Sequence, residues 1–271
     1  MKIGVEIAES QWEVDAGAAV ELAISLDFNG KQPRAFGLSP ARAEAVKAGD
    51  FVGDTRRGGS ANCETLRLTP HGNGTHTEGV GHLTEERIAL AAAASDPLMA
   101  TALLTVPSRD IATVDESYGG TWAPGDRVVC AQDLQQSYGA LAISDAFLGA
   151  VCIAVEAFDP QADHSGTNPP YLTTEAVQWL RRVGCRHLLV ELPSVDRESD
   201  GGSLPNHHLF FGVEHGKRAS EQSRKRTITE LIDVPQSAVD GPYALSLRFP
   251  HFQSDAAPSR PILYPLRPAQ R

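Results

Sequence analysis

One stretch of the sequence, residues 150–192, constrains the fold more than any other. It begins with AVCIAVEAF, a run dense in apolar and β-branched residues that predicts a buried strand. The segment TTEAVQWLRRV (173–183) predicts an amphipathic helix that Gly184 ends, and CRHLLVELP (185–193) predicts a second buried strand. A strand, a helix and a strand in this order are typical of a β-α-β crossover between parallel strands. The sequence therefore favours an α/β fold.

Most of the other predicted elements are strands. Alternating apolar and polar residues predict a hairpin or edge strand at 2–16, and residues 19–28 repeat this pattern. A capping Thr84 followed by two glutamates predicts a second helix over 84–94. Further strands are predicted within 64–70, 100–108, 118–131, 208–213, 227–234, 243–249 and 261–266. We therefore expect one domain over 1–271 with a strand-rich mixed β-sheet or barrel-like core and few helices, in which the N-terminal hairpin 1–26 is an accessory or oligomerisation element.

Charge and hydropathy exclude several classes of partner. Lysine and arginine number 24 and aspartate and glutamate 34, so the net charge is −10, which disfavours binding to phosphate backbones and to anionic lipid surfaces. The longest apolar stretch, 88–104, is interrupted at 95–97 and is unsuited to a bilayer span. The N-terminus has no apolar signal core, which indicates a cytoplasmic protein. The four widely spaced cysteines are interpreted as buried or semi-buried thiols rather than a zinc site or disulfides.

The segment HGNGTHTEGVGH, residues 71–82, contains the residues best suited to chemistry. It holds His71, His76 and His82 together with Glu78, interleaved with four glycines. The glycines disfavour a helix and favour an irregular loop whose backbone passes close to a bound atom. If the piece from His76 to Glu78 is extended, both side chains point to the same side. Imidazole and carboxylate together are ligands for Zn²⁺, Mn²⁺ or Fe²⁺. The sequence thus predicts a metal site, the alternative being unconnected polar residues on a surface turn.

A metal site on this loop needs ligands from elsewhere in the fold. Apolar neighbours surround Glu230 in TITELID, so it is either a buried carboxylate, which requires pairing or coordination, or a charge on an exposed edge strand. The other candidates are His207, His208, Glu191 and Asp196.

Three segments in the same order resemble the cyclase family, which includes bacterial kynurenine formamidase. The family signature His-x-Gly-Thr-His-x-Asp-x-Pro-x-His is similar to GTHTEGVGH here. The segment from Pro169 to Asp196 resembles the family's helix and following strand, and FQSDAAPSRPIL (252–263) resembles its closing segment. The similarity spans residues 71–265.

The resemblance implies a swivelling β/α/β-like fold and a centre that holds one or two divalent metal ions, zinc in the first place and manganese as the alternative. It assigns His76 as a ligand and Glu78 and Glu230 as bridging carboxylates. It also assigns His82 as the general acid/base and His207 as a further ligand. His71 is a ligand displaced by one residue, since it lies five residues before His76 and the family's first histidine lies four before. The activity implied is metal-dependent hydrolysis of a formamide-like or cyclic amide of a small molecule, arylformamidase-like, in a homodimer or larger homo-oligomer.

Departures from the signature leave other functions open. Glu78 replaces aspartate, Val80 replaces proline, and the loop 29–60 lacks the family's Trp-Pro-Gly turn, with Arg34 or Phe36 as candidate substitutes. The alternatives are a non-catalytic metal- or ligand-binding protein and a member that catalyses cyclisation or dehydration. A serine hydrolase is disfavoured because no GxSxG elbow is present; Ser194 is expected to cap a turn.

Overall fold

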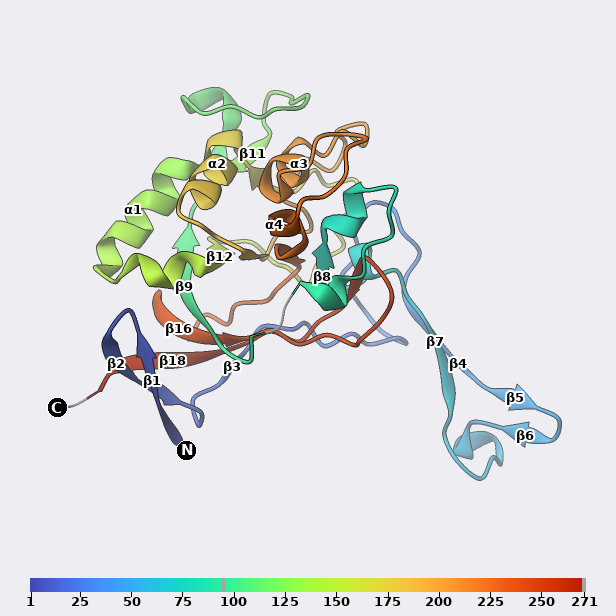
Figure 1. The fold of residues 1–271 in the computed structure, drawn as a ribbon. Helices are drawn as coiled ribbons and strands as arrows, with labels where there is room; N and C mark the ends of the chain where they lie inside the picture. Colours follow the sequence, from blue (N-terminus) through green and yellow to red (C-terminus); the bar gives the residue numbers. More distant parts are fainter. Residues whose placement is uncertain (94–95, 270–271) are drawn as a thin grey trace.

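The computed structural model describes residues 1–93 and 96–269, and a large mixed sheet forms its centre (Figure 1). The strand order is β1-β2-β18-β16-β9-β12-β14-β15-β8-β17, and β3 also pairs with β18. The strands of this sheet are β1 (Lys2–Ile7), β2 (Ser10–Asp15), β3 (Val20–Glu21), β8 (His76–Gly79), β9 (Met99–Val106), β12 (Ala150–Val155), β14 (His187–Val190), β15 (Thr227–Glu230), β16 (Gly241–Ser246), β17 (Ala256–Pro258) and β18 (Ile262–Pro268). The α-helices of the described residues are α1 (Ala131–Leu141), α2 (Thr174–Arg182), α3 (Pro205–Phe211) and α4 (Glu221–Arg224). The predicted strand-rich mixed sheet with few helices is confirmed.

Parallel strands form the middle of the sheet. Strands β9, β12, β14 and β15 are parallel neighbours, whereas β16 and β8 flank them in antiparallel orientation. Helix α2 connects β12 to β14, so the predicted β-α-β unit is confirmed. The hydroxyl of Thr173 accepts the backbone N–H of Ala176 at the start of α2. Gly184, with φ of 83°, follows the end of the helix, where the left-handed conformation favours glycine.

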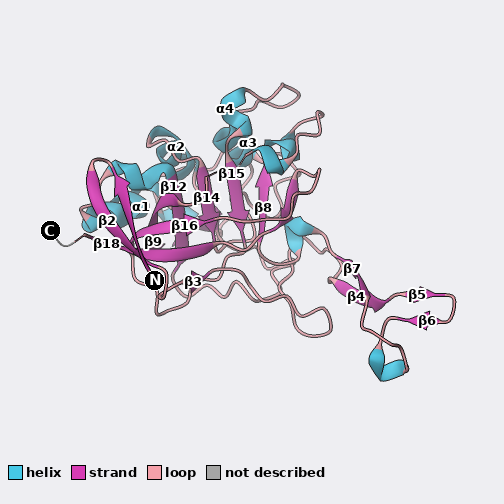
Figure 2. Ribbon diagram, turned by 60° about the horizontal axis from the view of Figure 1, so that its bottom comes forward, coloured by secondary structure: helices cyan, strands magenta, loops and turns pink. Residues whose placement is uncertain are grey.

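Both faces of the sheet are covered. The helices lie together on one face (Figure 2). There, Leu134, Leu180 and Phe210 belong to one core cluster with side chains of β12, β14 and β15. The opposite face carries a second cluster that includes Leu103 and Leu263. Because the parallel strands are buried on both faces, their sequences are continuous apolar runs rather than alternating ones.

Two ribbons extend this body at opposite ends (Figures 1 and 2). The N-terminal hairpin of β1 and β2 continues the sheet through the pairing of β2 with β18. The second ribbon, which we call the arm (residues 42–67), projects away from the body. It consists of β4 (Arg42–Ala45), β5 (Lys47–Ala48), β6 (Phe51–Val52) and β7 (Glu64–Arg67). A third small sheet is made of β10 (Arg109–Asp110), β11 (Arg127–Val129) and β13 (Tyr171–Leu172).

Several sequence-based predictions are wrong. The described part of 84–94 is not an α-helix: the N–H of Leu90 donates to the carbonyl of Ser254, so this segment bonds to a distant one; residue 94 lies outside the described residues. Residues 208–211 of the strand predicted at 208–213 lie in helix α3, and α1 was not predicted. Cys63 is exposed, whereas the other three cysteines are buried as expected, and all four are free thiols. Among the described residues, no helix has the length and apolar character needed to cross a membrane.

Candidate metal centre

Strand β8 lies between β15 and β17 and fixes the backbone of the glycine-rich segment. Glu78 is opposite Ile228 on one side and Ala256 on the other, and β8 is buried along its whole length. The segment predicted to be an irregular loop is thus partly an interior strand. Gly74, with φ of 90°, makes the turn into it. The extended backbone that β8 provides is the condition under which His76 and Glu78 point to one side.

The structure brings together all six residues predicted for the site. His71 lies on a 3₁₀ turn at Pro70–Gly72 and His82 on another at Val80–Leu83, on either side of β8. Glu230 ends β15 directly opposite His76, and His207 comes from α3. His207 and Glu230 lie more than a hundred residues beyond the segment 71–82 in the chain, so the site depends on the sheet topology.

Glu78 is the centre of the arrangement, and its side chain is 1% exposed. His71 Nδ1 lies 3.0 Å from Glu78 Oε2 and His82 Nε2 lies 3.9 Å from the same oxygen. His207 Nε2 lies 3.1 Å from Oε1. One buried carboxylate therefore faces three imidazoles.

Glu230 makes a second, smaller cluster beside the first. His76 Nε2 lies 3.3 Å from Glu230 Oε2, and His207 Nε2 lies 3.6 Å from Oε1. The backbone N–H of Val195 also donates to Oε1 at 3.1 Å. Glu230 is buried, which decides between the two environments that the sequence left open for it. His207 lies between the two carboxylates.

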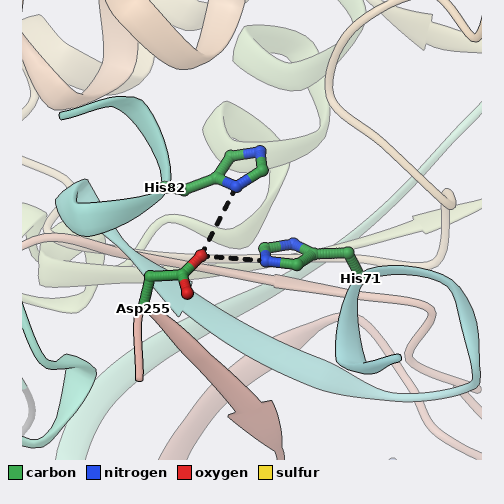
Figure 3. Close-up of side chains that lie close together, drawn as sticks. All are labelled: His71, His82 and Asp255. Carbon is green, nitrogen blue, oxygen red and sulfur yellow. Dashed lines mark hydrogen bonds and ion pairs between the residues drawn. The ribbon is translucent and has the colours of Figure 1, made fainter. Parts of the chain in front are cut away.

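Each of His71, His76 and His207 has one ring nitrogen that points away from Glu78 and Glu230, and that nitrogen has a hydrogen-bond acceptor of its own. His76 Nδ1 donates to the carbonyl of Gly74 at 3.0 Å, and His207 Nδ1 to Asp196 Oδ2 at 2.6 Å. His71 Nε2 bonds to Asp255 Oδ2 at 3.1 Å (Figure 3). Acceptors on the outer nitrogens of histidines are the usual support of metal-binding imidazoles. The sequence analysis assigned no role to Asp255, although its segment was part of the family resemblance.

The inner atoms, in contrast, lack hydrogen bonds. Both carboxylate oxygens of Glu78 and Nε2 of His76 are buried and have no hydrogen-bond partner among the described residues, despite the close approach of ring nitrogens. Four ligands around a zinc ion lie about 3.4 Å from one another, close to the distances found here. Three overlapping groups, His71–His76–Glu78, Glu78–His82–His207 and His71–His82–Asp255, each offer three ligand atoms within 4.8 Å of one another. These residues fit a divalent cation.

The pKa shifts of the site in the absence of an ion show which positive charges a bound cation would replace. Burial would raise the pKa of Glu78, but the charges of His82 and His207 and close contacts with His207 and His71 hold it well below its usual value. Burial would likewise lower the pKa of His71, yet its hydrogen bond to Asp255 and its contact with Glu78 raise it to about 10. The pKa of His207 is raised well above its usual value, against the effect of burial, mainly by Glu78 and Asp196. Protonated imidazoles thus balance the carboxylates when no cation is bound.

A cavity of about 270 Å³ opens onto this centre. His71 and His82, whose side chains are about a quarter exposed, face it, whereas Glu78, His207 and Glu230 lie at its base. The rest of the wall consists of Phe36, Ser194, Arg197, Glu198, Asp200, Gly202 and Leu204. Arg34 is instead paired with Asp163 and does not line the cavity, so only Phe36 of the two loop candidates does.

Three other candidate ligands from the sequence analysis do not face the interior of the metal centre: His208, Glu191 and Asp196. His208 Nδ1 bonds to the carbonyl of Val213 at 2.6 Å. Glu191 accepts the backbone N–H groups of Val155 and Val234, and burial raises its pKa to about 7. Asp196 supports His207, as described above.

Ser194 is not arranged as a nucleophile. Its hydroxyl oxygen accepts the backbone N–H of Asp196 at 3.0 Å, as expected for a residue that caps a turn.

Three solved structures share the fold over most of both chains. The "predicted metal-dependent hydrolase" of Bacillus stearothermophilus has a TM-score of 0.56 at 14% identity and covers 91% of this chain and 97% of its own. Isatin hydrolase A of Labrenzia aggregata has 0.56 at 13%, covering 91% and 93%. Isatin hydrolase A of Ralstonia solanacearum has 0.54 at 14%, covering 92% and 91%.

No curated protein matches the sequence. A family model described as "Putative cyclase" matches residues 11–197, which include β8, the flanking histidines and the β-α-β unit. This match covers more than half of the chain and agrees with the shared fold. The chain therefore belongs to the cyclase family.

Proposed function

We propose that the protein is a metal-dependent hydrolase that cleaves an amide of a small molecule, either formamide-like as in arylformamidases or cyclic. The observation that carries the proposal is the buried Glu78, whose two oxygens accept no hydrogen bond although three imidazoles face them. A buried carboxylate in this state is costly unless a cation completes it. We propose zinc as the ion, with manganese as the alternative, held by His71, His76, Glu78, His207 and Glu230.

The chain supplies positioning and proton transfer. When bound, a divalent ion would polarise a carbonyl and lower the pKa of water in the site. His82 is the imidazole least engaged with the carboxylates, since its nitrogens lie 3.9 Å from Glu78 and 3.6 Å from Asp255. Its side chain is 26% exposed to the cavity, so it can receive a proton from an attacking water and deliver it to the leaving nitrogen.

Two features support the choice of substrate class. The cavity has the size of a small molecule rather than a polymer segment. Isatin, on which two of the structural relatives act by name, is a cyclic amide. These relatives are only 13–14% identical to this chain, which is why a formamide stays beside a cyclic amide in the proposal.

The test combines metal analysis with an activity screen. Protein purified without chelator should contain close to one or two equivalents of zinc or manganese, and should hydrolyse at least one member of a panel of aryl formamides, lactams and esters. The variant His82→Ala should keep its metal and lose about 10²–10⁴-fold in turnover. Less than about a tenth of an equivalent of metal, with no zinc-dependent stabilisation, contradicts the metal centre. Full metal with no activity on the panel would favour a non-catalytic binding protein.

We further propose that the protein acts as a homodimer or larger homo-oligomer. Strand β1 pairs only with β2 among the described strands, so its outer edge is free to pair with a second copy. Light scattering coupled to size-exclusion chromatography tests this, and a mass of one chain, 29.0 kDa, contradicts it.

A further inference from the structure

The outer hydrogen bonds of the site fix which nitrogen each histidine offers to its interior. The carbonyl of Gly74 can only accept, so Nδ1 of His76 carries the hydrogen and Nε2 keeps its lone pair for the interior. The same reasoning applies to His207, whose Nδ1 donates to the Asp196 carboxylate. Both histidines therefore offer Nε2.

His71 is oriented the other way. Its Nε2 bonds to Asp255 Oδ2, and its Nδ1 is the atom that faces Glu78. The two contacts have almost the same length, 3.1 Å and 3.0 Å, but only the contact with Asp255 has hydrogen-bond geometry, because both oxygens of Glu78 lack a hydrogen-bond partner. Nε2 of His71 is therefore the nitrogen that carries the hydrogen and donates it to Asp255, and Nδ1 keeps its lone pair toward Glu78.

The same oxygen of Asp255 also faces His82. His82 Nδ1 lies 3.6 Å from Asp255 Oδ2 (Figure 3). Its Nε2 faces Glu78. The rings of His71 and His82 are stacked, with centroids 4.2 Å apart and an interplanar angle of 27°, so one carboxylate oxygen reaches both. It is hydrogen-bonded to Nε2 of His71 and makes a longer electrostatic contact, at 3.6 Å, with Nδ1 of His82.

The backbone holds Asp255 in this place. Strand β17 pairs with β8 so that Ala256 lies opposite Glu78, and the carbonyl of Asp255 accepts the N–H of Gly79 at 2.9 Å. The carboxylate is therefore attached to the same strand pair that carries the ligands. Its position does not depend on a mobile loop.

We propose that Asp255 is a positioning residue that sets opposite tautomers in two neighbouring histidines: the cation meets Nδ1 of His71, as it meets Nε2 of His76 and His207, whereas His82 keeps the lone pair of its Nε2 free to accept a proton. This assignment rests on the proposed metal centre. It predicts that Asp255 acts through the histidines and does not itself bind the ion.

The experiment uses the zinc-loaded full-length protein labelled with ¹⁵N-histidine. Long-range ¹H–¹⁵N spectra distinguish the two tautomers, and single histidine substitutions assign the signals. The expected result is a protonated Nε2 in His71 and a protonated Nδ1 in the other three histidines. In Asp255→Ala the signals of His71 and His82 should lose these tautomer preferences, whereas those of His76 and His207 stay unchanged.

Zinc affinity from competition with a chromophoric chelator gives the second readout. Loss of an outer acceptor typically weakens metal binding about 10–100-fold, which is the loss expected for Asp255→Ala. Asp255→Asn keeps a carbonyl oxygen and should restore most of the affinity and both tautomers. Glu21→Gln is the matched control: it removes the ion pair to Arg260 in the same closing segment without touching a histidine, and should leave both readouts unchanged.

The outcomes separate the two proposals. If the wild-type protein binds no zinc, manganese or other divalent ion, the proposed function itself fails. If it binds zinc but His71 carries its hydrogen on Nδ1, or Asp255→Ala retains both its affinity and its tautomers, the positioning role is wrong and the metal centre stands. A zinc-bound crystal structure with Asp255 Oδ2 within about 2.2 Å of the ion would likewise overturn the positioning role, because that is a bonding distance.

Discussion

The strongest test of the centre is Glu78→Gln, which preserves the shape of the side chain and removes its charge. Glu78 is the residue that three imidazoles share, so its amide variant should lose the stabilisation that a cation gives to the folded state. A free ion concentration 100 times the Kd stabilises the native state by about 2.7 kcal/mol. For a chain of 271 residues the entropy of unfolding makes this about 5 °C in Tm.

The assay is thermal unfolding after removal of metal with EDTA and dialysis, with and without added zinc or manganese. Wild-type protein and the Glu21→Gln control should gain about 5 °C, and Glu78→Gln less than about 1 °C. A full metal-dependent shift in Glu78→Gln would refute the reasoning, because the ion would then be held without the residue at the centre of the site.

Three further predictions concern other parts of the molecule. Because the pKa of His71 is raised to about 10 without metal, the free protein holds a proton that a cation must displace; zinc affinity should rise with pH toward 10 and fall in acid, and calorimetry in buffers of different ionisation enthalpy should detect released protons at pH 7.5. Replacing 46–63 in the arm by an Asn-Gly turn should leave Tm and zinc affinity unchanged, and a loss of affinity beyond about threefold would contradict the separation of arm and site. Gly81→Ala places a Cβ 2.2 Å from the carbonyl oxygen of Ile88 and should cost about 1–3 kcal/mol in urea unfolding, whereas Gly4→Ala, which meets nothing within 4 Å, should cost nothing.

The sequence predicted the middle of the sheet because its strands are apolar on both faces. The apolar runs at β9, β12 and β14 are stable only where both faces of the strand are buried, which is the middle of a covered sheet. Gly184 marks the end of the helix between β12 and β14. The prediction needed no knowledge of distant residues. That is why it succeeded here.

Segments whose partners lie far away in the chain were predicted incorrectly. Residues 84–94 have helix-forming alanines, yet Ile88 and Leu90 are both buried at a spacing of two, and the N–H of Leu90 bonds to the carbonyl of Ser254 instead of to a preceding turn of helix. The segment 208–213 has the apolar content of a strand, but Pro205 starts a helix three residues before it and Gly212 ends that helix. Local composition does not contain the tertiary contact of 84–94, whereas for 208–213 the signals of the helix lie at Pro205 and Gly212 and not in the apolar residues themselves.

The site shows the same limit. The spacing within 71–82 was enough to propose a metal loop, and the resemblance supplied His207 and Glu230, which the structure places within 4 Å of the loop residues. Asp255 could not be given a role from the sequence, since its position depends on the pairing of β17 with β8. The tautomers of the histidines are likewise a property of the assembled site.

The division of the cavity between sheet and loops has a consequence for adaptation. At its base, Glu78 lies on β8, Glu230 lies on the neighbouring β15, and His207 comes from helix α3. The other lining residues reach the cavity from connecting segments: Phe36, Ser194, Arg197, Glu198, Asp200, Gly202 and Leu204. Side chains of those segments can be exchanged without moving the strand. Mutational libraries confined to these side chains are therefore the way to change which compound the cavity accepts, because the residues proposed to hold the metal stay unchanged.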